Sequence, residues 1–148
     1  MLGKNSRLLL IIGLVIFFVA FVISRLQFFA CPTVEISSDS GEYIYWLDFY
    51  SKLGKLPPNN FIPLGYPAVI KLLTLIKDSV YPIVYFQFAF TFFSFTVLLY
   101  TIWRIYSKSI YFSMLFLLCV YVQVPNNLFW DIYICSESVY TSNLVLLF

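Results

Sequence analysis

The chain contains no histidine, so any general base in it must be an aspartate or a glutamate. Two acids lie in stretches that could do chemistry: Asp39 in SSDSGEYIYW and Glu137 in SESVYT. One carboxylate could accept the proton of an incoming hydroxyl group, while the other bound Mg²⁺ or Mn²⁺ through oxygen. The cation would screen the phosphate of a lipid-linked leaving group. Asp39 and Glu137 are therefore the candidate catalytic residues and the candidate metal ligands.

Each of these acids also has a purely structural interpretation. Asp39 with Glu42 three residues later matches a capping box, in which both side chains accept backbone N–H groups at a helix start. Glu137 follows Ser136 in the first turn of a predicted helix, where the helix dipole favours an acid. Asp131 is interpreted as a solvated loop residue. The sequence alone leaves the capping and catalytic interpretations open.

The composition predicts an all-α integral membrane protein. Hydrophobic residues make up 61% of the chain and charged residues 11%, whereas soluble proteins carry about 25% charged residues. The net charge of +2 gives no indication of a nucleic-acid partner. The three cysteines match no zinc or CxxC spacing, and a disulfide between Cys31 and Cys135 is an open possibility.

The pattern of apolar runs divides this single membrane domain, residues 1–148, into spans and loops. Three transmembrane helices are predicted at about 8–29, 80–102 and 110–124, because these runs are apolar and nearly free of charge, although the third is short for a span. A fourth apolar run begins at 139 and reaches 148, too short to cross a bilayer as a helix. The alternative for the first run is a signal peptide with a cleavage site before Cys31.

Basic residues predict the orientation in the membrane. Lys4, Arg7, Arg104 and Lys108 flank the predicted spans without any acid among them, so these ends should face the cytoplasm. The loops 30–79 and 125–138 are then extracytoplasmic, which places Asp39 and Glu137 on the same side. We expect a multi-pass protein of the cell (inner) membrane with a cytoplasmic N-terminus.

The first outer loop is predicted to contain two interfacial helices. Over 43–53, apolar side chains such as Tyr43 and Tyr50 fall on one face, and charged ones such as Asp48 fall on the other. A second helix is predicted to begin around Pro67, because proline suits a first helical turn, and to run to Lys77.

Three motifs in this order resemble the N-terminal third of the GT-C glycosyltransferases. These polytopic enzymes include the dolichyl-phosphate-mannose protein mannosyltransferases and the bacterial aminoarabinose transferases. The first motif is an acid followed by a tyrosine-containing helix, DSGEY at 39–43. The second is a Pro-Gly-Tyr-Pro element, matched by PLGYP at 63–67 with Leu64 in place of a proline. The third is SESVYT at 136–141, which is similar to a Ser-Glu-x-x-(Tyr/Phe)-Thr element.

The resemblance implies transfer of a sugar from a polyprenyl-phosphate donor to an acceptor on the outer face. It implies that Asp39 is the base, that Glu137 is a supporting acid or metal ligand, and that Glu42, Tyr43 and Tyr66 bind substrate. The expected partners are membrane lipid, the donor, and the remaining part of the enzyme or a partner membrane subunit. Because family members continue with many more spans, the chain is expected to be a front fragment, inactive alone.

Two other classes of function are weighed against the enzyme. The first is a small noncatalytic membrane protein, a subunit or assembly factor, in which Asp39 and Glu137 only cap helices. The second is a transporter fragment. The transporter is disfavoured because the predicted spans are interpreted as carrying no polar or ionisable group at mid-depth.

Overall fold

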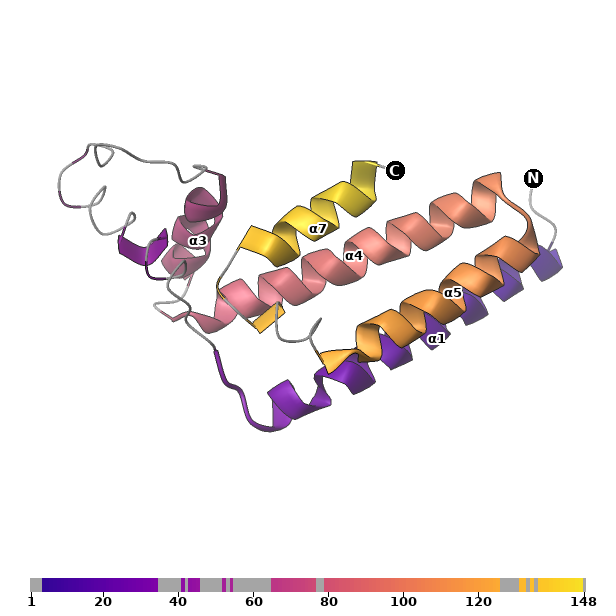
Figure 1. Cartoon of the computed structure of the whole chain (residues 1–148), viewed down its shortest axis with the longest axis horizontal. Coiled ribbons are helices and arrows are strands. Elements are labelled where there is room, and N and C mark those ends of the chain that lie inside the picture. The colour runs from indigo at the N-terminus through magenta and orange to yellow at the C-terminus, as the bar shows by residue number, and fades with distance from the viewer. Residues whose placement is uncertain are drawn as a thin grey trace.

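The computed structural model describes residues 4–34, 41, 43–45, 52, 54, 65–76, 79–125, 131–132, 134 and 136–147, without the side chains of 4, 5 and 136–138 (Figure 1). Within these ranges the regular elements are the helices α1 (Lys4–Ala30), α3 (Gly65–Ile76), α4 (Tyr81–Ile105), α5 (Lys108–Gln123) and α7 (Ser136–Leu147). The all-helical prediction is therefore confirmed for the described part of the chain.

Local sequence signals account for three of the helix ends. α1 ends at Ala30, shortly before Pro32, which cannot continue a helix. α4 carries Pro82 in its first turn, where the missing N–H would have had no helical partner. Ser107 caps α5 by accepting a hydrogen bond from the backbone N–H of Ile110 at 3.5 Å. α3 begins at Gly65, two residues before the predicted start at Pro67.

Two of these helices are long and apolar enough to cross a membrane, namely Ser6–Ala30 in α1 and Tyr81–Ile105, which is α4. α5 and α3 are shorter apolar helices. α1, α4 and α5 cover the three predicted spans, and crossing of a membrane stays a prediction for each of them. Of the predicted helix 43–53, only residues 43–45 and 52 lie in helix among those described, so that prediction falls mainly outside the described residues.

The long helices run lengthwise through the molecule, and successive ones point in opposite directions (Figure 1). α5 lies beside α1, and α4 contacts α1, α5 and α7. The N-terminus and the connection between α4 and α5 lie at one end of the molecule. The last turn of α1, the start of α4 and the helix α3 lie at the other end (Figure 1). α3 contacts the bundle through α4.

Aromatic side chains fill the space between α1 and α4. The ring of Phe92 stacks on Phe17 with centroids 5.8 Å apart and lies 5.3 Å from the ring of Phe21. Phe95 meets Phe17 edge to face at 6.2 Å. Offset and edge-to-face contacts of this kind are favourable beyond the area they bury. We call these four phenylalanines the aromatic core.

A glycine allows α1 and α5 to approach closely. Gly13 faces the ring of Tyr111, and a Cβ atom added at Gly13 would come within 2.2 Å of the Tyr111 hydroxyl oxygen. Tyr111 is fully buried, and its hydroxyl donates to the backbone carbonyl of Leu10 at 3.4 Å. Its ring meets Trp103 of α4 edge to face at 4.8 Å. Tyr111 therefore joins three helices only because position 13 has no side chain.

We expect Gly13→Ala to lower the free energy of unfolding by about 1–3 kcal/mol, because Tyr111 must leave its position or α1 must move away from α5. Thermal unfolding in detergent, followed by tryptophan fluorescence, measures the change. Gly65→Ala is the matched control, since a Cβ atom there would meet no neighbouring atom of the described residues within 4 Å. Equal effects of the two substitutions would contradict this account of the contact.

Candidate functional site

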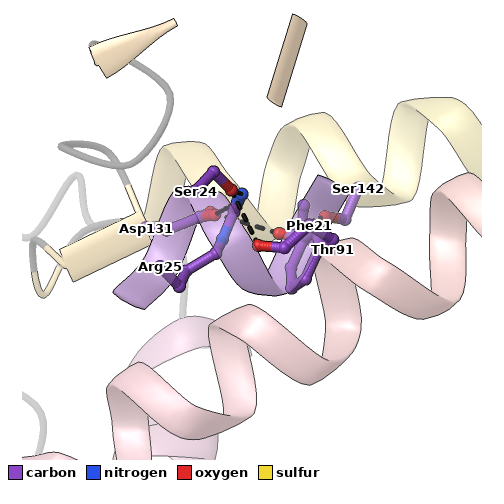
Figure 2. A network of polar contacts seen from close by, with 6 residues as sticks. All are labelled: Phe21, Ser24, Arg25, Thr91, Asp131 and Ser142. Carbon is purple, nitrogen blue, oxygen red and sulfur yellow. Dashed lines mark hydrogen bonds and ion pairs between the residues drawn. The ribbon is translucent and has the colours of Figure 1, made fainter. Parts of the chain in front are cut away.

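A polar network lies buried between the helices, and we define it as Ser24, Arg25, Thr91, Asp131 and Ser142 (Figure 2). Ser24 and Arg25 come from α1, Thr91 from α4 and Ser142 from α7. Asp131 comes from the connection between α5 and α7. The network thus joins three helices and one connecting segment, although its members are distant in the sequence.

An ion pair between Arg25 and Asp131 forms the centre of the network. The two side chains are only 1% and 5% exposed, and Nη2 of Arg25 donates to Oδ2 of Asp131. Nη1 of Arg25 donates to Oγ of Ser24, which in turn donates to the backbone carbonyl of Phe21 at 2.7 Å. The guanidinium lies over the ring of Phe21, 3.7 Å from its centroid, in cation–π geometry. Each buried charge therefore has an opposite charge as its neighbour.

Hydroxyl groups extend the network from the ion pair to α4 and α7. Oγ1 of Thr91 donates to Oδ1 of Asp131 at 3.2 Å and lies 3.3 Å from Oγ of Ser142. Because a threonine hydroxyl has a single hydrogen, Ser142 is the donor in the second bond. Thr91 thereby links the carboxylate of Asp131 to the face of α7 that packs on α4.

The burial of Asp131 corrects two interpretations of the sequence. Asp131 is not a solvated loop residue, because the whole residue is only 4% exposed. The interpretation that the spans carry no polar or ionisable group at mid-depth is also wrong for α4, since the buried residues Thr91 and Ser94 lie near the middle of that helix. One signal could have been used: an arginine within an apolar helix needs a partner when it is buried. The partner itself, 106 residues away, left no local signal.

A second cluster joins the three sequence motifs. This motif cluster consists of Tyr43, Tyr66, Ile70, Ile83 and Ile134, all buried. The rings of Tyr43 and Tyr66 meet edge to face with centroids 5.1 Å apart. Val139 of α7 packs against the cluster. Tyr43 belongs to the motif 39–43, Tyr66 to 63–67 and Val139 to 136–141, so described residues of all three motifs meet in one place.

The structure describes only some of the predicted site residues. Tyr43 and Tyr66, the predicted substrate-binding tyrosines, are in contact with each other. Asp39 and Glu42 lie outside the described residues. Glu137 is in the first turn of α7, and its side chain is also outside the description. The base, the supporting acid and the shared metal site therefore stay predictions.

Metal binding and disulfide formation are likewise untested by the described side chains. Among them there is no group of three His, Cys, Asp or Glu residues that could hold a metal ion, and the predicted ligands Asp39 and Glu137 are not in that set. Cys31 is exposed, while Cys135 lies outside the described residues. Pairing of these two cysteines stays a prediction.

Comparison with known proteins gave no relative: no protein-family model, no curated protein and no solved structure matches the chain. The likeness to the GT-C glycosyltransferases therefore depends on the three motifs themselves. What the structure adds to those motifs is the contact between them in the motif cluster.

We expect Thr91→Val to lower the free energy of unfolding by about 1–3 kcal/mol, because it removes the hydrogen bonds to Asp131 and Ser142 in a buried place. Thr91→Ser keeps the hydroxyl and should retain most of the stability. Thr96→Val on the same helix is the matched control, since Oγ1 of Thr96 is buried without a hydrogen-bond partner among the described residues. Denaturant unfolding in detergent measures all three variants, and equal losses at positions 91 and 96 would contradict the network.

Proposed function

We propose that the chain is the front part of a multi-pass membrane enzyme that transfers a sugar from a polyprenyl-phosphate donor to an acceptor on the extracytoplasmic face. The motif cluster is the observation that carries the proposal. Tyr43, Tyr66 and Val139 come from three motifs far apart in the sequence and are held in one apolar cluster. If the three motifs form one site, their residues must lie close together, as they do in the motif cluster. If the motifs only capped separate helices, no contact between them would be required.

The exposed surface of α1 supports a membrane location. Large apolar side chains along the helix are about half exposed, among them Leu8, Val15, Phe18 and Ile23. In water each Å² of such surface costs about 25 cal/mol relative to burial, whereas lipid chains would cover it favourably. A continuous apolar surface on a helix long enough to span a bilayer is the property that a lipid-facing helix requires.

Basic residues at one end of the molecule support the proposed orientation. Arg7, Arg104 and Lys108 are all exposed, and they lie where α1 begins and where α4 connects to α5. These two places are at the same end of the molecule (Figure 1). Basic residues near spans are retained in the cytoplasm, so this end should be cytoplasmic and the motif cluster extracytoplasmic.

The orientation predicts which cysteines a membrane-impermeant maleimide reaches in intact cells. With Cys119 and Cys135 replaced by alanine and serine, the exposed Cys31 should react from outside. In a variant whose only cysteine is Tyr106→Cys, a position 57% exposed between α4 and α5, the reaction should require opened cells. Reaction of both cysteines from outside, or of Tyr106→Cys alone, would contradict the orientation.

In the proposed reaction, the acceptor hydroxyl attacks the anomeric carbon of the donor sugar. Asp39 takes the proton of that hydroxyl as the new C–O bond forms, and the bond from the sugar to the polyprenyl phosphate breaks. Glu137 supports the reaction as the second acid. Its carboxylate and that of Asp39 are oxygen ligands of the kind that Mg²⁺ and Mn²⁺ prefer, and such a cation would supply charge to screen the phosphate.

We expect Asp39→Asn, made in the complete enzyme that contains this chain, to lower sugar transfer in membranes by about 10²–10⁴-fold, because the base is lost. Labelled polyprenyl-phosphate mannose and polyprenyl-phosphate aminoarabinose are the donors to assay. Asp39→Glu should also impair transfer, since the added methylene displaces the carboxylate. Asp48→Asn, in the same loop but outside the three motifs, is the matched control and should retain transfer.

Near-normal transfer by Asp39→Asn would remove the base assignment. If the unaltered enzyme transferred neither sugar and Asp39→Asn changed only the stability, by about 1 kcal/mol, Asp39 would be a helix cap. The chain would then be assigned to the noncatalytic class, a membrane subunit or assembly factor.

A further inference from the structure

The Arg25–Asp131 pair lies beside the interior of α4 and α7, although Arg25 itself is five residues from the end of α1. At about 1.5 Å per residue, Thr91 lies about 15 Å along α4 from its first residue, and Ser142 about 9 Å along α7. Asp131 bonds directly to Thr91, which bonds to Ser142. The residue that leads into α7 is therefore held beside the interior of α4, not beyond its end.

Stability alone does not explain a buried ion pair. Removing two charges from water costs several kcal/mol each, and the attraction between the charges often only repays that cost. Removing one partner is far more costly, because the other charge stays buried without compensation. The geometry instead fixes the position of the Asp131 carboxylate. The planar guanidinium of Arg25 contacts Asp131, Ser24 and the face of Phe21 at once, so the carboxylate is held in one place.

The ion pair connects to the motif cluster through a short stretch of chain. Ile134, three residues after Asp131, is fully buried in that cluster with Tyr43 and Tyr66. α7 begins two residues later at Ser136. Val139 and Ser142 lie three residues apart on one face of α7, so the bond from Thr91 to Ser142 fixes which face α7 turns toward the cluster.

We propose that Arg25 and Asp131 are positioning residues for the transfer site, an inference that rests on the function proposed above. Their ion pair determines where α7 begins and how it is rotated, and it thereby holds the third motif, with Glu137, against the first two. Neither residue touches the reacting atoms. Loss of the pair releases the chain around Ile134 and the start of α7, while the aromatic core stays packed.

The test uses cysteine reactivity and sugar transfer in the same membranes. Ile134→Cys is placed in the complete enzyme after replacement of Cys31, Cys119 and Cys135, and membranes are opened so that a polar maleimide reaches both faces. With Arg25 present the cysteine should be protected. Arg25→Gln should raise its labelling rate at least about tenfold through local opening, and Arg25→Lys, which keeps the charge, should restore much of the protection.

A second probe separates local release from general unfolding. Ser94→Cys replaces a fully buried residue of α4 by one of similar size, and it should stay protected in Arg25→Gln. In the transfer assay Arg25→Gln should lower kcat by about a hundredfold with little change in the KM for the donor, because the third motif is displaced while the donor still binds. Arg25→Lys should recover part of that loss.

Three results would overturn the proposal. The first is continued protection of Ile134→Cys in both Arg25→Gln and Asp131→Asn. The second is labelling of Ser94→Cys together with Ile134→Cys. The third is an unchanged kcat in a variant in which Ile134→Cys has become reactive. Failure of the proposed function has a different signature. In that case the unaltered enzyme transfers no sugar, while Arg25→Gln still exposes Ile134→Cys and leaves Ser94→Cys protected.

Discussion

The structure depends on one constraint, that the charge of Arg25 inside an apolar helix must be neutralised. The partner is Asp131. Bulk water does not solvate either charge, because both side chains are almost completely buried. Meeting this constraint places Asp131, which lies between α5 and α7 in the sequence, inside the bundle. The hydroxyl of Thr91 donates to Asp131 and accepts from Ser142, so Thr91 links the carboxylate to α4 and ties α7 to α4.

The aromatic side chains provide the rigid surroundings in which this ion pair can exist. Phe21 belongs both to the aromatic core and to the network, since its ring contacts Phe92 and also lies under the guanidinium of Arg25. About two turns nearer the N-terminus of α1, Gly13 and Tyr111 set the approach of α5. Close packing at both places leaves α1 little freedom to shift along its axis, which keeps Arg25 at the level of Thr91.

The proposed function depends on a different part of the molecule, the motif cluster. It is physically continuous with the bundle, because Val34 packs both against the hydrophobic core that contains Phe17, Phe21 and Phe95 and against the motif cluster. Ile134 gives a second connection, three residues from the ion pair. A displacement of helices within the bundle would therefore also shift the residues of the motif cluster. The positioning role proposed for Arg25 and Asp131 depends on this continuity between the bundle and the motif cluster.

The sequence by itself determined the helices, because their signals are local: apolar runs in α1 and α4, Pro82 in the first turn of α4, and the Ser107 cap of α5. It also determined the order of the three motifs and the presence of a charged residue, Arg25, in an apolar helix. The tertiary structure alone decided which of the seven acids pairs with Arg25, and it brought the ring of Tyr43 into contact with that of Tyr66. These contacts join residues distant in the chain, and their energies depend on burial and on packing around both partners, which no local pattern of residues records.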